Sequence, residues 1–110
     1  MSMYLVKFAF TAATWSHLIE NLEDRRKVLE PVFASIGGKL HGYWYAFGDA
    51  DVYILAELPN DAVAVDVITK VAASGSFESV STTKLFTVDE VLDAIRGAAD
   101  VKYAGPGAAS

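Results

Sequence analysis

Apolar residues recur along this chain with two different spacings, and the order in which the spacings alternate leaves few folds open. Residues 3–10 are rich in β-branched and aromatic side chains and predict a first strand. Spacing typical of a helix follows, with Thr14 as the expected N-cap. A second helical start is expected at Asn21. Pro31 predicts a kink or a restart near Lys27, because proline removes one helical hydrogen bond.

The two spacings alternate once more in the remainder of the chain. A glycine pair ends the helical stretch, and aromatic-rich runs at 39–47 and 52–58 surround a turn of small and acidic residues. This pattern predicts a β-hairpin. A helix is expected after Asn60, with Gly75 as its stop, and residues 77–86 predict a fourth strand.

The expected order is therefore β, α, β, β, α, β, followed by one more helix. This order is typical of the α+β class with a split βαβ or ferredoxin-like arrangement, a four-stranded antiparallel sheet with its two main helices on one face. The extra C-terminal helix is predicted by Thr87 and Glu90, which have the spacing of a capping box, before an amphipathic stretch. A single domain is expected over residues 1–99 and a flexible tail over residues 100–110.

Composition excludes several classes of function. The chain of 110 residues has no cysteine, which rules out disulfides, thiolate catalysis and cysteine-bound metals. Its net charge of −5 argues against nucleic acid as a partner, because phosphate binding needs clustered lysine and arginine. No leader and no run of membrane-spanning length is present, so a cytoplasmic protein is expected. The apolar fraction of 53% favours self-association, because one small monomer cannot bury that much apolar surface.

An aromatic ribbon, HGYWYAF at 41–47, predicts what the helix-free face of the sheet carries. Successive strand residues point to opposite faces, which places His41, Tyr43, Tyr45 and Phe47 together on that face. The expected cross-strand neighbours are Tyr45 with Tyr53, Tyr43 with Leu55 and His41 with Glu57. This register requires a three-residue loop or a bulge at the hairpin turn. So aromatic a face would be covered by a second copy of the chain.

The stretch GGKLHGYWYAFG at 37–48 resembles the GYD domain family of small bacterial and archaeal proteins, and the resemblance extends over residues 3–97. It implies a dimeric α+β barrel, in which ferredoxin-like protomers pair through their open sheet faces, and it implies no established activity. Related barrels include cofactor-free monooxygenases, isomerases and haem enzymes, which is analogy at the level of the fold. The turn departs from the family pattern, because Ala50 stands in place of the family's tyrosine.

Candidate site residues are expected on the helix-free face. His41 with Glu57 is a possible proton-transfer pair, and the alternative is a histidine that is hydrogen-bonded across a hairpin. The aromatic walls of a pocket would be Tyr43, Tyr45, Tyr53 and Trp15, with Asp51 in the adjacent turn. Packing between two sheets explains the tyrosines equally well. Two carboxylates in the turn do not make a metal site, so no metal and no cofactor are expected.

Two functions of different classes stay open from the sequence. One is a homo-oligomeric small-molecule-binding protein or cofactor-free enzyme, of oxygenase or isomerase type, with a pocket at the open sheet face. It would act on a small aromatic or enolic compound, with His41 and Glu57 as the catalytic groups. The other is a non-catalytic oligomerisation or regulatory module. Neither nucleic acid nor a membrane is an expected partner.

Overall fold

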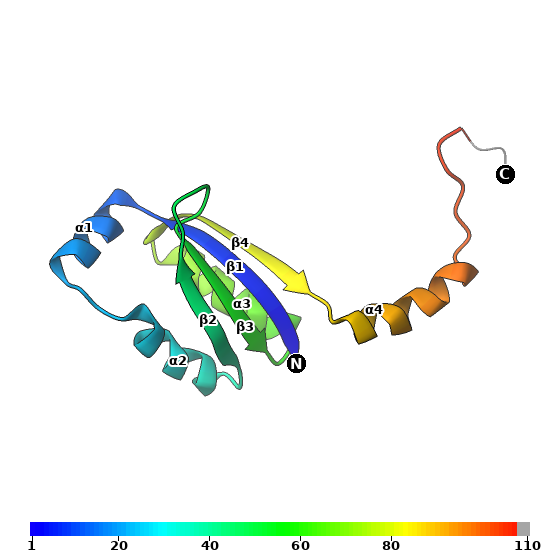
Figure 1. Ribbon diagram of the computed structural model, residues 1–110, viewed down its shortest axis with the longest axis horizontal. Helices are drawn as coiled ribbons and strands as arrows, with labels where there is room; N and C mark the ends of the chain where they lie inside the picture. The colour runs from blue at the N-terminus through cyan, green and yellow to red at the C-terminus, as the bar shows by residue number, and fades with distance from the viewer. Residues whose placement is uncertain (108–110) are drawn as a thin grey trace.

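Four antiparallel strands form one sheet in the computed structural model, which describes residues 1–107 (Figure 1). The strands are β1 (Ser2–Phe10), β2 (Lys39–Tyr45), β3 (Val52–Leu58) and β4 (Phe77–Leu85). Their order across the sheet is β2-β3-β1-β4, with every neighbouring pair antiparallel. This order confirms the predicted ferredoxin-like α+β arrangement. Strands β2 and β4 end slightly before the predicted bounds.

The helices are α1 (Ala12–Glu20), α2 (Arg25–Ser35), α3 (Asp61–Ala73) and α4 (Val88–Ile95), and α4 runs into a 3-10 turn, η1 (Arg96–Asp100). Both α2 and α3 cover the same face of the sheet, because Phe33 of α2 and Ala64 of α3 belong to one buried cluster with strand residues. Helix α1 stands at one end of the sheet, and α4 extends away from the opposite end (Figure 1). The extra C-terminal helix is thus present.

The N-caps of the first two helices differ from the predicted ones. Thr11 caps α1, because its Oγ1 accepts a hydrogen bond from the Thr14 amide at 3.2 Å. Asp24 caps α2 by accepting from the Arg26 amide at 3.0 Å. Threonine and aspartate both favour the N-cap position. The spacing of the apolar residues alone therefore could not decide which of several neighbouring residues caps each helix. The expected restart before Pro31 occurs at the start of α2, which then continues through the proline.

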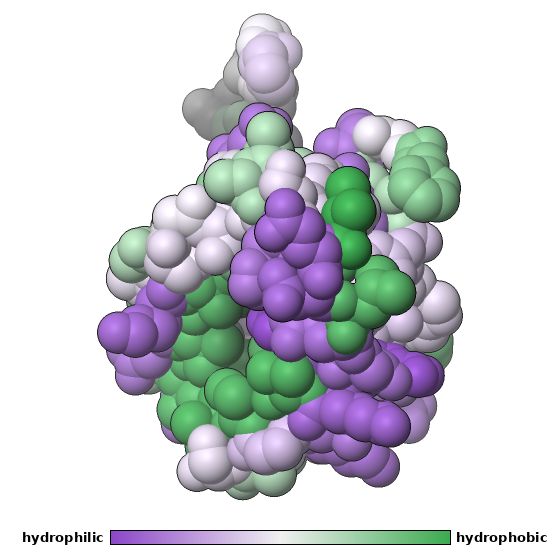
Figure 2. Space-filling view, turned by 90° about the vertical axis from the view of Figure 1, so that its left-hand side faces the viewer, coloured by the Kyte–Doolittle hydropathy of each residue, from purple (hydrophilic) through white to green (hydrophobic). Residues whose placement is uncertain are grey.

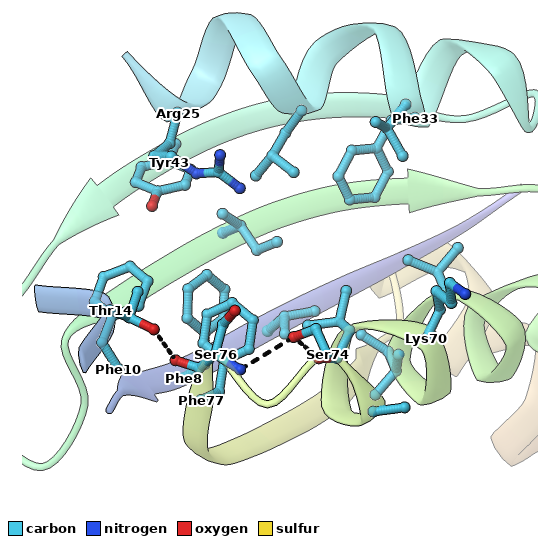
Figure 3. Close-up of a pocket in the computed structure, with 18 of the residues that line it drawn as sticks. Phe8, Phe10, Thr14, Arg25, Phe33, Tyr43, Lys70, Ser74, Ser76 and Phe77 are labelled. Carbon is cyan, nitrogen blue, oxygen red and sulfur yellow. Dashed lines mark hydrogen bonds between the residues drawn. The ribbon is translucent and has the colours of Figure 1, made fainter. Parts of the chain in front are cut away.

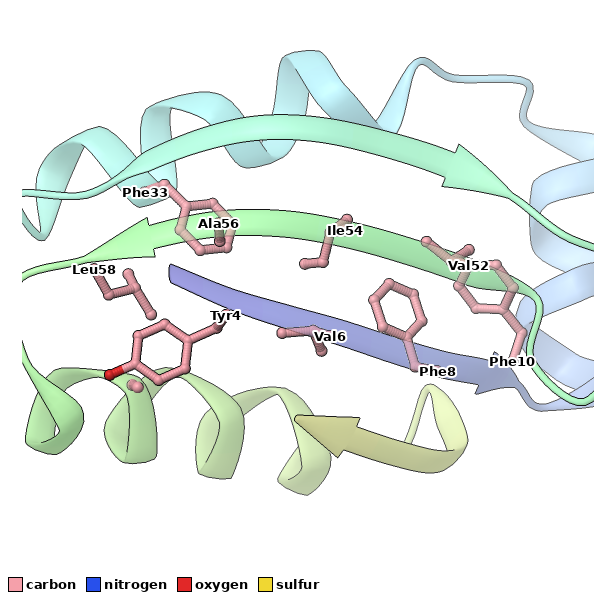
Figure 4. Packing of buried hydrophobic residues seen from close by; sticks show 10 residues of the cluster. Tyr4, Val6, Phe8, Phe10, Phe33, Val52, Ile54, Ala56 and Leu58 are labelled. Atoms are coloured by element: carbon pink, nitrogen blue, oxygen red, sulfur yellow. The ribbon is translucent and has the colours of Figure 1, made fainter. Parts of the chain in front are cut away.

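The core lies between the helices and one face of the sheet (Figure 4). Alternate residues of β1 and β3 are buried there, as period-two patterning requires. These residues are Tyr4, Val6, Phe8, Phe10, Val52, Ile54, Ala56 and Leu58. The opposite face, called the open face below, carries the intervening residues of the same strands, and no helix in the described part of the chain covers it.

A β-bulge at His41 changes the register predicted for β2. The pairing runs Lys39 with Glu57 and Leu40 with Ala56, and then resumes as Gly42 with Leu55, Tyr43 with Ile54, Trp44 with Tyr53 and Tyr45 with Val52. The bulge absorbs one residue, so each later side chain of β2 points to the face opposite the predicted one. Tyr43 and Tyr45 therefore lie on the helix-covered side, and Trp44 lies on the open face. The predicted pairings of Tyr43 with Leu55 and of Tyr45 with Tyr53 are therefore wrong. The bulge was predicted at the hairpin turn, but it lies within β2.

The C-terminal segment begins with the predicted capping box. Thr87 Oγ1 accepts from the Glu90 amide at 3.1 Å, and Glu90 Oε1 accepts from the Thr87 amide at 3.3 Å. The two bonds satisfy amide groups that have no partner within the helix. Of the tail predicted over 100–110, only Asp100 belongs to η1, which spans Arg96–Asp100. Residues 108–110 of that prediction lie outside the described residues.

Candidate functional site

A cavity of about 480 Å³ lies between the helix-covered face of the sheet and the helices α2 and α3. Residues of α1 line one end of it. Figure 2 looks onto the end of the molecule that carries α1 and shows hydrophobic residues gathered in a hollow of that surface. The sequence predicted a pocket on the open face, whereas this cavity lies on the other side of the sheet.

Four phenylalanine rings form the apolar walls of the cavity: Phe8, Phe10, Phe33 and Phe77. The rings of Phe8 and Phe77 meet edge to face with centroids 4.6 Å apart, and Phe10 stacks on Phe77 at 5.5 Å. Aliphatic side chains of α2 and α3 complete the walls. Packed aromatic pairs hold their geometry, so the walls keep a fixed shape. A rigid apolar surface of this kind suits a flat apolar ligand.

Polar side chains also line the cavity, among them Arg25, Tyr43 and Lys70. Figure 3 shows Arg25 beside Tyr43, with Lys70 of α3 on the other side. Arg25 is paired with Glu23, their side-chain nitrogen and oxygen being 3.0 Å apart. Among residues 1–107, no carboxylate lies within salt-bridge distance of Lys70. Two cations and one carboxylate therefore line the cavity, although the chain as a whole carries a net charge of −5.

Tyr43 is the tyrosine of the predicted site that lines this cavity. Burial, and to a smaller degree the neighbouring Tyr45, raises the pKa of the Tyr43 hydroxyl above its usual value. The two rings lie edge to face with centroids 5.4 Å apart. The Tyr43 phenol is therefore neutral at physiological pH and can donate a hydrogen bond to a ligand oxygen.

Hydrogen bonds fix the end of the cavity at which α1 meets β4. The Thr14 hydroxyl donates to the Ser76 carbonyl at 2.8 Å, and the Ser76 amide donates to Ser74 Oγ at 3.3 Å (Figure 3). The Thr11 amide also donates to the Ser76 carbonyl at 3.1 Å. Because α1 and the loop after α3 share these bonds, this end of the cavity has a defined shape.

The predicted pair of His41 and Glu57 does form, on the open face. The His41 Nε2 and Glu57 Oε1 atoms are 2.9 Å apart, and both side chains are about one-third exposed. The bulge places His41 within reach of Glu57 even though Lys39 is the register partner of that glutamate. The pair lies on the opposite side of the sheet from the cavity.

Two aromatic side chains, Trp44 and Tyr53, lie on the same open face as this pair. The Trp44 ring lies across Gly42, since a Cβ atom built at Gly42 would come within 2.2 Å of it. Trp44 itself is 54% exposed and faces Tyr53 across the strands. The open face thus carries an imidazole, a carboxylate and two aromatic rings, and no helix among residues 1–107 covers them.

The remaining predicted site residues have structural contacts. Trp15 packs edge to face on Phe10 with ring centroids 5.0 Å apart, and it lies 6.4 Å from the ring of Tyr45. Asp51 Oδ2 accepts a hydrogen bond from the Phe10 amide at 2.8 Å, which ties the hairpin turn to the end of β1. The structure therefore divides the predicted site between the two faces of the sheet and does not gather it in one pocket.

Sequence reasoning missed the two cations of the cavity. Arg25 belongs to a basic run that follows Glu23 and Asp24, and acid before base is the order typical of a solvated helix face with local ion pairs. Its pairing with Glu23 confirms the ion pair, but Arg25 also lines the cavity with 28% of its side chain exposed. Lys70 carried no sequence signal, because a single lysine in a helix is ordinary. Only the packing of α2 and α3 brings these residues around one space.

A second polar cluster escaped the sequence reasoning as well. The buried Tyr4 hydroxyl donates to Asp61 at the start of α3, and Lys84 of β4 lies 2.9 Å from the same carboxylate. Hydrogen bonds from Tyr4 first, and then from Lys84, hold the pKa of Asp61 below its usual value. The cluster joins α3 to β1 and β4, and its contacts are those of a structural tie.

Residues 1–107 hold neither a cluster of metal-binding side chains nor a membrane-spanning helix. Within this range, no three histidine, cysteine, aspartate or glutamate side chains lie close enough together to hold a metal ion. None of the helices in the described part of the chain is both long and apolar enough to span a bilayer.

Comparison with known proteins identifies a family and a structural neighbour. The profile of the GYD domain matches residues 4–95. Comparison with curated proteins gives no match. A solved structure described as "crystal structure of FFRP-DM1" superposes with a TM-score of 0.53 at 13% sequence identity, covering 78% of this chain and 100% of that chain. At this identity the likeness concerns the fold.

Proposed function

The chain belongs to the GYD domain family, and we propose that it is a homo-oligomeric protein that binds a small aromatic or enolic molecule. The observation that carries this proposal is the cavity of about 480 Å³ between the sheet and the helices α2 and α3. Ligand pockets have volumes of roughly 300–1,000 Å³ and combine apolar walls with a few polar groups. Protein interiors otherwise close up, because an unfilled apolar space forfeits dispersion contacts.

The charges around the cavity favour an anionic ligand. Arg25 and Lys70 outnumber Glu23 there, in a chain whose overall charge is negative. A carboxylate or enolate would gain attraction from both cations, while its apolar body would pack on the phenylalanine walls. The neutral Tyr43 hydroxyl adds a hydrogen-bond donor. The proposed ligand is therefore an aromatic carboxylic acid or a compound that ionises to an enolate.

The open face supports the proposed self-association. Its aromatic rings include Trp44, which is 54% exposed, and Tyr53 with its polar hydroxyl. Such rings favour surfaces where one end packs and the other meets water or a hydrogen-bond partner. Pairing of two open faces would cover these rings with the same surface of a second copy, as a two-fold interface requires.

A catalytic role for His41 with Glu57 is the second candidate, and their contact of 2.9 Å favours it. A histidine held by a carboxylate is suited to proton transfer near neutral pH. Because this pair lies on the open face, a substrate for it would be enclosed between two protomers. Cofactor-free isomerase or oxygenase chemistry would take place there, away from the cavity.

Binding in the cavity is tested by filling it. Val67 lines the cavity, and Val65 on the same helix is exposed and does not line it. We expect a panel of aromatic and enolic acids to include compounds that raise the melting temperature of the wild type, because a ligand of the native state stabilises by mass action. Val67→Trp should abolish the shift, and Val65→Trp should retain it. Equal shifts in both variants, or no shift with any compound, would refute the cavity as the binding site.

The catalytic candidate is tested by His41→Ala. Turnover of any compound that the wild type converts should be lost, while sedimentation shows an unchanged oligomer. A rate equal to that of the wild type would dismiss the role of His41. The alternative, a non-catalytic oligomerisation or regulatory module, predicts that the wild type converts no compound and that its function depends only on its assembly into oligomers.

A further inference from the structure

Two ion pairs stand next to each other at the start of α2, and they differ in how completely each arginine is bonded. Asp24 binds Arg26 at two points, with Nε–Oδ1 and Nη2–Oδ2 distances of 3.1 and 2.8 Å. Glu23 contacts Arg25 through Nη1 alone, at 3.0 Å. Within residues 1–107, the N–H groups on Nε and Nη2 of Arg25 have no hydrogen-bond partner. These two donors, called the fork below, are those that bind a carboxylate at two points.

The two arginines also differ in where they lie. Arg25 lines the cavity and has 28% of its side chain exposed, whereas Arg26 does not line it and is 60% exposed. Figure 3 shows Arg25 beside Tyr43, whose neutral hydroxyl is a further donor. A partly sheltered cation attracts an anion more strongly than an exposed one, because less water screens the interaction. The fork of Arg25 is therefore a polar anchor at the wall of the cavity.

Lys70, the other cation of the cavity, is a less selective group. It is exposed to solvent, and its ammonium is a strongly hydrated point charge on a flexible stem. A guanidinium is planar and less strongly hydrated, and its paired N–H groups match the spacing of two carboxylate oxygens. Arg25 thus favours a carboxylate over an enolate, which presents one charged oxygen, while Lys70 attracts either anion.

Glu23 is itself a carboxylate at the cavity, so it competes with an acidic ligand for Arg25. Its side chain lines the cavity and is 38% exposed. An acid that binds Arg25 either displaces Glu23 into water or lies next to it, where two negative charges repel each other. Ion pairs with this exposure are weak, so displacement costs little. Glu23 therefore lowers the affinity for acids without closing the site, and it leaves the affinity for neutral molecules unchanged.

We propose that Arg25 is the anchor of the cavity and that its ligand is an aryl carboxylate, bound at two points in competition with Glu23. The inference rests on the proposed binding function and deepens it, because it chooses the carboxylate over the enolate and gives the charged groups separate roles. The carboxylate would lie at Arg25 of α2 and Tyr43 of β2, and the aromatic ring would pack on the phenylalanine walls.

The first test measures the preference for a carboxylate by titration calorimetry. Aryl carboxylates, beginning with naphthalene-2-carboxylate, are each compared with their own neutral primary amide. The wild type should bind the acid roughly tenfold more tightly, because hydrogen bonds to a charged group are the stronger ones. If no acid and no amide binds, the proposed function and the anchor both fail. If acid and amide bind equally well, the cavity remains a binding site and the anchor alone is refuted.

Substitutions of the two cations separate a two-point anchor from a general attraction. Arg25→Lys keeps the charge and loses the fork, so it should weaken acid binding roughly tenfold and leave amide binding unchanged. Lys70→Gln should weaken acid binding by only about threefold. Lys27→Gln removes a charge from the same helix outside the cavity and should change neither affinity. Unchanged acid binding in Arg25→Lys, or a larger loss in Lys70→Gln, would overturn the proposal.

Glu23→Gln tests the competition, since it removes the charge and keeps the size of the side chain. The acid should bind about threefold more tightly and the amide should bind as before. Glu20→Gln removes the same charge outside the cavity, and it should leave both affinities within about 1.5-fold of the wild type. Weaker acid binding in Glu23→Gln would show that Glu23 holds Arg25 in place for the ligand. A gain no larger than that of Glu20→Gln would reduce its role to net charge, and either result would overturn the competition.

Discussion

Replacement of Gly38 by alanine tests the junction that sets one wall of the cavity. Gly38 lies between α2 and β2, and its amide donates to the Phe33 carbonyl at 2.8 Å. A Cβ atom at this position would come within 2.6 Å of the Glu57 carbonyl oxygen and 2.9 Å of Leu58 Cδ2. The nearest of these atoms belongs to the backbone of β3, so it cannot rotate away. The chain must shift to accept a methyl group.

The expected cost follows from these contacts. Overpacking that displaces the backbone costs about 1–3 kcal/mol. The hydrogen bond from the Gly38 amide to the Phe33 carbonyl restrains the backbone shift that would relieve these contacts. Weakening this bond adds about 1 kcal/mol to the destabilisation. Alanine also lowers the conformational entropy of the unfolded chain, which offsets about 0.4–1 kcal/mol of the destabilisation. Gly38→Ala should therefore lower the free energy of unfolding by about 2–3 kcal/mol, or the melting temperature by about 10–20 °C.

Urea unfolding followed by circular dichroism measures this free energy, with Gly48→Ala as the matched control. A Cβ atom at Gly48 meets nothing within 4 Å, and Gly48 has no positive φ angle. Gly48→Ala should therefore stay within about 0.5 kcal/mol of the wild type. A Gly38→Ala protein as stable as Gly48→Ala would show that the junction yields easily, and the reasoning from the close approach would be wrong.

Two further predictions concern pH and the open face. Hydrogen bonds from Tyr4 and Lys84 hold the pKa of Asp61 below 3.8, so the stability that they contribute is present above this pH and lost as pH falls below it. Asp61→Asn should make the acid loss of stability in urea titrations shallower, and an unchanged acid slope would count against the cluster. Gly42→Ala should push the Trp44 ring off the strand, which sedimentation would register as a weaker dimer and fluorescence as a red-shifted tryptophan spectrum. An unchanged spectrum would contradict this geometry.

Local signals in the sequence predicted most of the fold. The order of strands and helices, the hairpin and the buried alternation of β1 and β3 all follow from apolar spacing and turn residues. The capping box at Thr87 was found because its two residues interact within one turn of helix. Features of this kind depend on neighbours in the sequence, so they can be read without knowledge of the packing.

The faces of β2 were predicted less well, and the cause is one residue. The bulge at His41 reverses every later side chain, which moves Tyr43 and Tyr45 to the helix-covered side. In a strand with alternating polar and apolar residues, a wrong register would place polar side chains in the core, so the sequence itself would reveal the error. Aromatic residues occupy both faces of this strand, so both registers bury a similar apolar surface.

The sequence by itself thus determined the architecture and the second helical start before Pro31. It also suggested the contact between His41 and Glu57, although the bulge at His41, and not the predicted register, brings the two side chains together. Only the tertiary structure decided where the cavity lies and which side chains surround it. Arg25, Tyr43 and Lys70 belong to three separate elements, and they face one space because α2 and α3 are held apart over the sheet. Spacing along the chain reports contacts within an element, whereas the distance between two packed helices depends on all the side chains between them.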